Sequence, residues 1–257
     1  MRPNRLKQIW AEGKPVLNGW CNMPGAFIAE SVAAMGWDAV TLDTQHGLIG
    51  YSEMVAMLQA MAAAPVTPLV RVSWNSPGEI MKALDSGAYG IICPMINTRA
   101  ECEAFVRACR YPPLGYRSFG PIRAAMVAGA EYYPEANDEL LTLAMIETAE
   151  GLANVDAIVA TPGLDGVYIG PSDLSLSHGG QPRQDSQEPA LLAQFKRILA
   201  ACKGAGIRSG VHTTSAAYSR QMIAMGFDLV TVGSDLGWLM SGRRAAMEMR
   251  DHIDGKG

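Results

Sequence analysis

The sequence has no excess of positive charge and no long apolar run. It contains 21 lysines and arginines against 25 aspartates and glutamates, a formal net charge of −4. This balance argues against nucleic acid as the main partner, because no basic excess is available to neutralise phosphates. No stretch reaches the roughly 18 apolar residues of a membrane span. The charged start MRPNRLKQIWAEGK lacks the apolar segment of a secretory signal. We therefore expect a cytoplasmic protein with neither a nucleic-acid nor a membrane partner.

Cysteine is scarce, odd in number and never arranged as CxxC, which argues against a disulfide framework. The five residues are Cys21, Cys93, Cys102, Cys109 and Cys202. This pattern is typical of free thiols in a reducing cytosol. A catalytic or metal-binding cysteine is the alternative.

What the sequence has is a recurrent pattern in which a helical segment ends at glycine and a short apolar strand follows. The copies are AMGWDAVTLD (34–43), DSGAYGIICP (85–94), TPGLDGVYIG (161–170), AGIRSGVH (205–212) and AMGFDLVTVG (224–233). Glycine after the last helical turn tolerates the left-handed backbone that reverses the chain. The strands lack polar alternation, so both of their faces should be buried, as in parallel sheets.

Filling the gaps gives eight strand–helix pairs, which predict one (β/α)8 TIM barrel over residues 1–257. An open doubly wound sheet is the alternative, but no GxGxxG follows the first strand. In the segment SPGE (76–79), Ser76 and Glu79 suggest a capping box, whereas 110–138 is predicted to be irregular. Strands are expected at 16–21, 38–43, 67–72, 90–94, 141–147, 165–170, 207–212 and 228–233. Helices are expected at 24–35, 52–63, 77–86, 98–110, 149–160, 188–204, 214–225 and 235–251.

In such a barrel the active site lies at the carboxyl ends of the strands. Polar residues follow several of the predicted strands at that point, and they should meet at one mouth although they are distant in sequence. They are Asp43, Gln45 and His46 after the second strand, Arg71 after the third, Glu147 after the fifth, Asp173 after the sixth, and His212 with Thr213 after the seventh.

Two carboxylates predict a metal site at this mouth. Glu147 follows the apolar run LLTLAMI, where a lone carboxylate would be costly to bury. Asp173 follows Gly170 and Pro171, which allow a sharp, stiff turn, although Ser172 or Asp173 could instead cap a helix. Carboxylates on adjacent strands repel unless a proton or cation lies between them, and oxygen ligands suit Mg²⁺ or Mn²⁺. A metal-free acid–base pair is the alternative.

Arg71 and His46 are the other candidate catalytic residues. Burial of Arg71 in PLVRV requires an anion, either a structural carboxylate or the carboxylate or enolate of a substrate. Asp43 could orient the imidazole of His46, which could act as a base near neutral pH. All six lysines fall in predicted helices or near the chain ends, so a Schiff-base mechanism is not expected.

The chain resembles the metal-dependent class II pyruvate aldolases, the 4-hydroxy-2-oxoheptane-1,7-dioate aldolase family of phosphoenolpyruvate/pyruvate-binding barrels. The stretches that carry the resemblance are GWDAVTLDTQHG, PLVRVSWNSP, RYPPLGYRSFGP, AMIET and DGVYIGPSDLS. They occur in the same order over most of the chain. Two positions depart from the family's pattern: Gln45 replaces a glutamate, and Tyr168 replaces a phenylalanine.

The resemblance implies a role for each matching residue. Glu147 and Asp173 would bind the divalent ion (Mg²⁺, Mn²⁺ or Co²⁺), Arg71 would bind pyruvate, and Asp43 with His46 would act on a water. Trp20 would form a wall of the acceptor pocket, and the peptide N–H groups of Ser172 and Asp173 would meet the pyruvate carboxylate. Gly170 and Gln45 complete the expected substrate site, with Tyr168, Arg123 and His212 as further candidates. The resemblance also implies a homo-hexamer in which 235–251 packs on a neighbouring subunit.

The expected activity is the reversible aldol addition of a pyruvate or hydroxypyruvate enolate to an aldehyde. The partners would be small 2-keto acids and aldehydes. An acyl-CoA carbon–carbon lyase of the citramalyl-CoA type is one alternative, for which Arg117 and Arg123 are the only loop arginines that could meet CoA. A non-catalytic barrel that binds a keto acid is the other.

Overall fold

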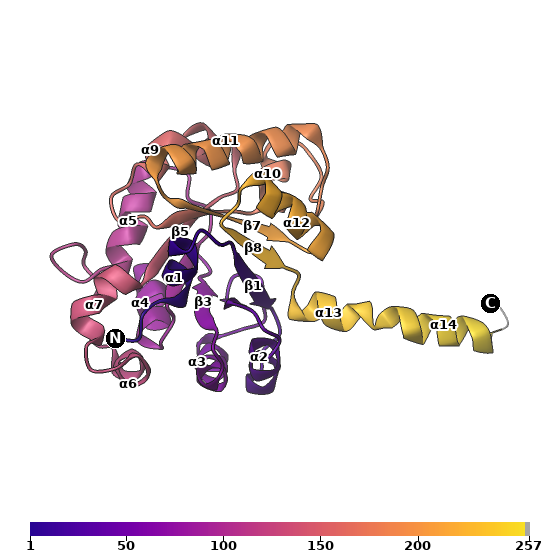
Figure 1. Cartoon of the computed structure of the whole chain (residues 1–257), viewed down its shortest axis with the longest axis horizontal. Helices are drawn as coiled ribbons and strands as arrows, with labels where there is room; N and C mark the ends of the chain where they lie inside the picture. The colour runs from indigo at the N-terminus through magenta and orange to yellow at the C-terminus, as the bar shows by residue number, and fades with distance from the viewer. Residues whose placement is uncertain (255–257) are drawn as a thin grey trace.

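Eight parallel strands form a closed barrel in the computed structural model, which describes residues 1–254 (Figure 1). Each strand pairs with the next along the chain, and β1 closes the barrel against β8. The last three residues of the predicted domain, 255–257, lie outside the described part. The strands are β1 Val16–Cys21, β2 Ala39–Asp43, β3 Thr67–Arg71, β4 Gly90–Cys93, β5 Leu141–Ile146, β6 Gly166–Ile169, β7 Arg208–Thr213 and β8 Leu229–Val232. The predicted TIM barrel is confirmed.

Helices surround the barrel. They are α1 Arg5–Ala11, α2 Ala26–Ala33, α3 Tyr51–Ala60, α4 Pro77–Asp85, α5 Arg99–Cys109, α6 Ile122–Ala128, α7 Tyr132–Glu139, α8 Ala149–Ala153, α9 Val155–Val159, α10 Pro171–Ser177, α11 Pro189–Ala205, α12 Ala216–Met225, α13 Asp235–Ser241 and α14 Arg243–Ile253, with the short 3₁₀ helix η1 Met61–Ala63 after α3. All eight predicted helices have a counterpart in this set.

Several details of the predicted helices are wrong. The segment 110–138 is not wholly irregular, because it contains α6 and most of α7. The helix predicted at 149–160 is divided at Asn154, and the one predicted at 235–251 is divided at Gly242. The capping box suggested at Ser76 and Glu79 does not form, because the side chain of Ser76 makes no capping bond. Glu79 accepts a hydrogen bond from Ser73.

The strands alternate between two apolar layers, and this alternation decides which residues reach the barrel interior. Even in strands without polar alternation, successive side chains point to opposite faces. In β2, Val40 and Leu42 pack outward in the core beneath the helices, whereas Ala39 packs in the interior cluster. In β6, Val167 and Ile169 likewise face outward and Tyr168 faces inward.

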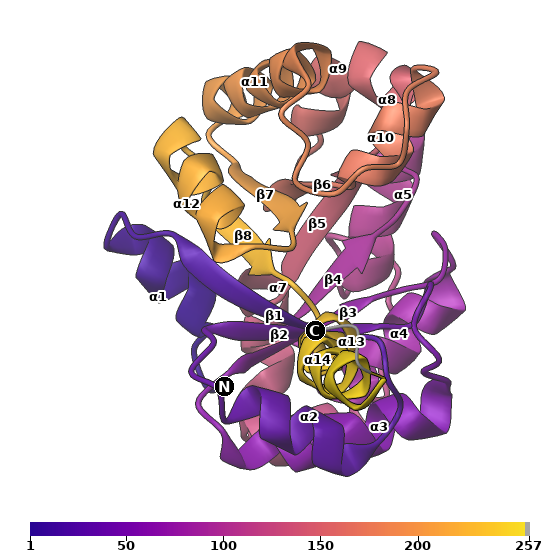
Figure 2. The same cartoon turned by 90° about the vertical axis from the view of Figure 1, so that its right-hand side faces the viewer.

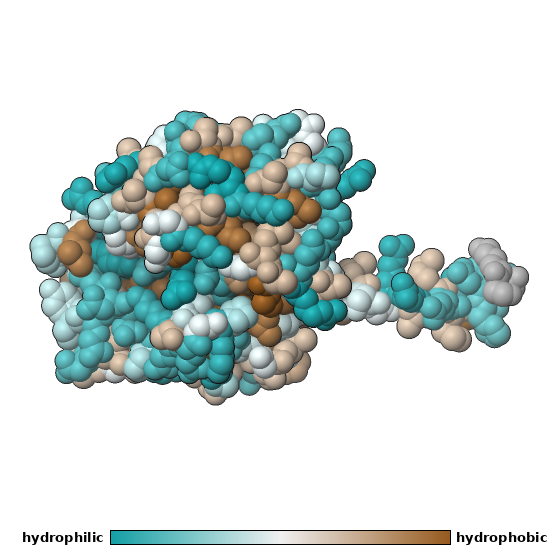
Figure 3. All heavy atoms as spheres, turned by 45° about the horizontal axis from the view of Figure 1, so that its top comes forward, coloured by the Kyte–Doolittle hydropathy of each residue, from teal (hydrophilic) through white to brown (hydrophobic). Residues whose placement is uncertain are grey.

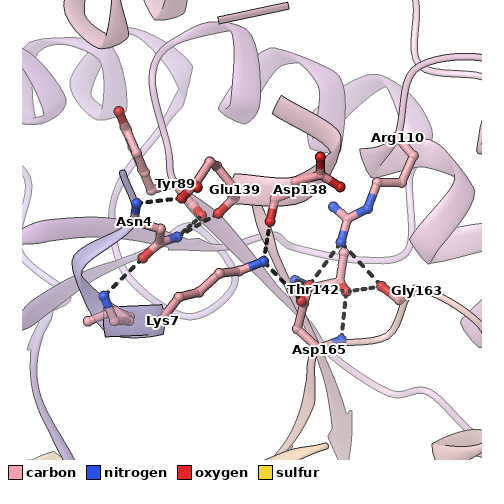
Figure 4. Close-up of polar contacts among 10 residues, drawn as sticks. Asn4, Lys7, Tyr89, Arg110, Asp138, Glu139, Thr142, Gly163 and Asp165 are labelled. Carbon is pink, nitrogen blue, oxygen red and sulfur yellow. Dashed lines mark hydrogen bonds and ion pairs between the residues drawn. The ribbon is translucent and has the colours of Figure 1, made fainter. Parts of the chain in front are cut away.

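The N-terminal segment covers the amino end of the barrel (Figure 4). The amide nitrogen of Asn4 donates to the carbonyl oxygens of Tyr89 and Glu139, at 3.2 and 2.8 Å. Lys7 lies 3.4 Å from Asp165. Leu6 is completely buried in the same inner cluster as the strand side chains. The helix α1 therefore forms the floor of the barrel opposite its mouth.

The last two helices leave the barrel. Figure 1 shows α13 and α14 extending away from it, and Figure 2 shows α14 nearly end-on in front of the barrel. The space-filling view in Figure 3 shows hydrophobic and hydrophilic side chains mixed along this protruding segment. No residue of α14 is buried, and Met247, Met249 and Ile253 are exposed.

The floor should contribute strongly to stability. We expect Leu6→Ala to lower the free energy of unfolding by about 2–5 kcal/mol, because a buried leucine leaves a cavity when truncated. Leu17→Ala, at a partly exposed position of β1, is the matched control and should cost less than about 1 kcal/mol. Urea unfolding followed by circular dichroism measures both. Equal losses for the two variants would show that α1 is not part of the core.

Candidate active site at the carboxyl end of the barrel

Strand alternation brings the predicted site residues to one mouth. Asp43 and Arg71 are the last residues of β2 and β3, and they are directly paired in the sheet. Glu147 and Gly170 come immediately after β5 and β6, and His212 is the penultimate residue of β7. The side chain before each of these positions packs outward: Leu42, Val70, Ile146, Ile169 and Val211. The five positions therefore share the inward direction at the carboxyl end.

Asp43 and Arg71 form a two-pronged ion pair. Nε of Arg71 donates to Oδ1 of Asp43 at 2.8 Å, and Nη2 donates to Oδ2 at 2.5 Å. Burial alone would raise the pKa of Asp43, but the hydrogen bonds and charge of Arg71 outweigh it and lower that pKa below its usual value. The partner of Arg71 is thus a structural carboxylate. Its side chain remains 12% exposed, so part of the guanidinium still faces the mouth.

Trp20 lies against this ion pair. Its indole nitrogen donates to Asp43 at 3.3 Å, and the guanidinium carbon of Arg71 lies 4.9 Å from the ring centroid. The ring also packs edge-on against His212, with 4.9 Å between ring centroids, and stacks on Tyr168. Trp20 is buried, so it forms the base of the mouth with Arg71 on one side and His212 on the other.

Asp43 does not orient the ring of His46. Its carboxylate accepts hydrogen bonds from the peptide N–H groups of Gln45 and His46, at 3.0 and 3.3 Å. The turn is tight, because a Cβ on Gly47 would lie 2.2 Å from the carbonyl oxygen of Asp43. His46 is exposed at the rim. The amide oxygen of Gln45 is buried and has no partner among the described residues.

Glu147 is almost fully buried, and glycine makes its position feasible. Its Oε1 accepts a hydrogen bond from the peptide N–H of Met95 at 2.7 Å. A Cβ on Gly170 would lie 2.3 Å from its Oε2, so a larger residue there would displace the carboxylate. Burial, together with the nearby negative charge of Asp173, outweighs the hydrogen bond from Met95 and the charge of Arg71 and raises the pKa of Glu147 to about 7.

Ser172 and Asp173 lie in the first turn of α10, which begins at Pro171. Gly170 precedes this turn with no side-chain cap, so neither Ser172 nor Asp173 is the N-cap. Backbone N–H groups in a first helical turn lack partners within the helix. Asp173 is exposed, and Ser172 accepts a hydrogen bond from Gln184 at 3.0 Å.

Arg117 and Arg123 do not lie at the mouth of this chain. The fully buried Arg117 donates to Asp85 at 2.6 Å, and Arg123 donates to the carbonyl oxygen of Leu58 at 3.0 Å and to that of Ser86. Asp85 and Leu58 belong to the last turns of α4 and α3, which lie toward the amino ends of the strands. Arg123 is therefore not brought together with the other candidate residues.

Two other features bear on the predictions. The five cysteines are free, as predicted, and all of them are buried. Burial raises the pKa of each thiol, which disfavours the reactive thiolate. Met95 was not identified from sequence. Among residues 1–254 it is one of two non-glycine residues with left-handed backbone, at φ 57°, and nothing in the run ICPMIN signals this conformation.

Comparison with known proteins identifies the family of the chain. A sequence model of the HpcH/HpaI aldolase/citrate lyase family matches residues 19–241. The chain belongs to this family. It is 42% identical over 241 residues to a hydroxypyruvate/pyruvate aldolase of Rhizorhabdus wittichii, covering 94% of this chain and 96% of the relative. It is 34% identical to a 4-hydroxy-2-oxo-heptane-1,7-dioate aldolase of Salmonella arizonae, covering 94% of this chain and 92% of the relative.

Solved structures of the HpcH/HpaI family share the fold. The crystal structure of a family protein from Burkholderia cenocepacia superposes with a TM-score of 0.89 at 32% identity, covering 96% of this chain and 99% of that one. The citrate lyase β subunit of Mycobacterium tuberculosis is more distant, with a TM-score of 0.56 at 17% identity over 91% of this chain and 97% of that one. The predicted family is confirmed, as is the prediction of a carbon–carbon lyase.

Titration of Glu147 should be visible in the stability of the metal-free protein. Because its pKa is raised in the folded state, the folded protein holds more protons than the unfolded chain between about pH 4.5 and 7. The free energy of unfolding should therefore fall as the pH rises through this window, by at most about 3 kcal/mol from this residue.

The variant Glu147→Gln should remove this part of the slope, since glutamine keeps an acceptor for Met95 and carries no charge. The matched control is Glu150→Gln, an exposed carboxylate on α8. Urea unfolding in chelator at pH 5 and pH 7.5 provides the comparison. A wild-type slope retained in Glu147→Gln would contradict the raised pKa.

Proposed function

We propose that this chain is a metal-dependent class II aldolase that adds the enolate of pyruvate or hydroxypyruvate to an aldehyde, reversibly. The observation that carries the proposal is Glu147, a buried carboxylate that faces the mouth close to Asp173 and Arg71. The names of the relatives, hydroxypyruvate/pyruvate aldolase and 4-hydroxy-2-oxo-heptane-1,7-dioate aldolase, support the same chemistry.

The donor set suits a hard divalent cation. Glu147 and Asp173 offer carboxylate oxygens, and the negative charge of Asp173 disfavours ionisation of Glu147, which a cation would relieve. Among residues 1–254, no group of three or more His, Cys, Asp or Glu side chains is placed to hold a metal. The protein would therefore supply two ligands and leave positions for water and substrate. We propose Mg²⁺, Mn²⁺ or Co²⁺ as the ion.

Such an ion, when bound, would act as a Lewis acid that draws charge onto the keto oxygen of the substrate. Arg71 places a fixed positive charge where the enolate oxygen develops, and Asp43 prevents the guanidinium from reorienting. The free N–H groups of Ser172 and Asp173 would receive the substrate carboxylate beside Gly170. His46, exposed at the rim, would hold a water for proton transfer and serve the new hydroxyl group. Trp20 and Gln45 would border the aldehyde.

The assembly and location are proposed on the same basis. We propose a homo-hexamer in which 235–251 packs on a neighbouring subunit, because α14 buries none of its own residues in this chain. The barrel would be a single catalytic domain acting in the cytoplasm on small 2-keto acids and aldehydes. No helix in the described part of the chain is long and apolar enough to cross a membrane.

The acyl-CoA alternative has no specific support. Arg117 and Arg123, the loop arginines that could meet CoA, are committed to contacts away from the mouth. A non-catalytic barrel is disfavoured because it would not require a buried carboxylate of raised pKa beside a locked guanidinium.

Removal of divalent ions should abolish turnover. We expect no aldol cleavage after prolonged chelation followed by desalting. Added Mg²⁺, Mn²⁺ or Co²⁺ should restore the activity. A further sample with Ca²⁺ tests whether a larger cation suffices. Product formation measured with a coupled dehydrogenase is the readout. Full activity of the metal-free protein would exclude the proposed mechanism.

Arg71 should be required for enolate formation, the step that precedes any reaction with the aldehyde. We expect Arg71→Ala to slow the metal-dependent exchange of pyruvate methyl protons for deuterium at least about 100-fold, since one preorganised donor contributes roughly 3 kcal/mol to the barrier. Arg99→Ala, which removes an exposed guanidinium from α5, is the control. Proton NMR of pyruvate follows the exchange. An unchanged rate in Arg71→Ala would remove this residue from the mechanism.

A further inference from the structure

A continuous chain of polar side chains lies inside the barrel, directly beneath the mouth. Its members come from five different strands: Thr41, Asn18, Thr231, Tyr168 and His212. The first four are buried, and His212 is half-buried. Because each hydroxyl has one proton to donate, the direction of one bond in this chain fixes the direction of the next.

Asn18 sets the direction. Its amide satisfies its surroundings when Nδ2 faces the carbonyl oxygens of Gly19 and Ala39, at 3.1 and 3.3 Å, and Oδ1 accepts from the hydroxyl of Thr231 at 2.8 Å. In the opposite orientation the amide oxygen would lie against those carbonyl oxygens. Thr231 therefore donates its only hydroxyl proton to Asn18.

The remaining protons follow from this assignment. Oγ1 of Thr231 can now only accept from Tyr168, at 2.6 Å, so the Tyr168 hydroxyl uses its proton there. The contact between Tyr168 and Nδ1 of His212, at 3.1 Å, then requires Nδ1 to carry the proton. A neutral imidazole with a proton on Nδ1 has a bare lone pair on Nε2.

His212 is held in this neutral form. Burial, followed by the positive charge of Arg71, lowers the pKa of His212 to about 4. The ring is also fixed in place by the edge of Trp20. Nε2 has no hydrogen-bond partner among the described residues, and His212 points inward in the last layer of β7 before the mouth. The lone pair therefore opens onto the mouth, across Trp20 from Arg71.

We propose that Nε2 of His212 accepts a hydrogen bond from a hydroxyl group of the substrate, so that this residue selects hydroxyl-bearing substrates. The inference rests on the proposed function for the statement that substrate occupies the mouth. Two sources share this chemistry: the 3-hydroxyl of hydroxypyruvate and the hydroxyl of a 2-hydroxyaldehyde. Tyr168 would be a positioning residue that acts through the tautomer of His212.

The tautomer is tested without substrate or activity. In ¹⁵N-histidine-labelled protein at neutral pH, with the His212 signal assigned from a His212→Gln sample, we expect Nε2 to show the shift of an unprotonated ring nitrogen. Tyr168→Phe removes the acceptor for the Nδ1 proton and should move the His212 signal toward the other tautomer. A protonated Nε2 in the wild type would overturn the proposal.

Selectivity is tested with four substrate pairs, pyruvate or hydroxypyruvate combined with propanal or glycolaldehyde. In His212→Leu, kcat/KM for hydroxyl-bearing relative to hydroxyl-free substrates should fall about fivefold or more, as expected for one lost hydrogen bond. His212→Gln retains an acceptor and should keep more of the ratio. The arm that loses selectivity identifies which hydroxyl is bound.

Failure of the inference is distinguishable from failure of the proposed function. The role of His212 would be overturned if folded His212→Leu protein turned over substrate with unchanged kcat/KM ratios for all four pairs. That result would leave the proposed aldolase function standing. A wild type that forms no aldol product in any arm, with metal present, would overturn the proposed function. Tyr168→Phe should lower the same ratio as His212→Leu, to a smaller extent, and an unchanged ratio would remove Tyr168 from the account.

Discussion

A carboxylate almost without access to water is the constraint on which the site depends. Glu147 ends the apolar strand β5, and its negative charge is disfavoured by burial and by Asp173. Gly170 leaves the space for it, and the left-handed backbone of Met95 presents a peptide N–H to it. In the proposed mechanism, this arrangement costs stability without a cation and is maintained because it creates a binding position for one.

Around this carboxylate, Arg71 has two partners that prevent it from moving. Asp43 holds the guanidinium through both oxygens, and Trp20 supports it from below. A preorganised positive charge stabilises developing negative charge without reorganisation during the reaction. The ion pair makes Asp43 a positioning residue, because removing Asp43 would leave Arg71 free to turn toward Glu147.

The sequence predicted the barrel because its strands are short apolar runs that follow glycine, and the inward positions follow from the alternation of side chains. Asp43, Arg71 and Glu147 could be assigned to one mouth on this basis. Their contacts could not, since the Asp43–Arg71 pair depends on the register of β2 against β3, and the bond from Met95 depends on a backbone conformation that methionine rarely adopts. The pairing of Asp43 with the ring of His46 failed because the turn at Gly47 is tight enough to present peptide N–H groups instead. The helices α6 and α7 were missed because they are only 7 and 8 residues long, too short for a clear periodic pattern. The break at Gly242 was missed because a single glycine within a helical pattern does not by itself mark a boundary.

The central claim is that Glu147 and Asp173 share one hard cation within reach of Arg71. A crystal structure of the protein with Mn²⁺ and oxalate, a stable analogue of the enolate, tests it most directly. The account predicts one anomalous peak with an oxygen of Glu147 and an oxygen of Asp173 each about 2 Å away, and oxalate beside Arg71. Manganese bound elsewhere, or held by only one of the two carboxylates, would contradict it.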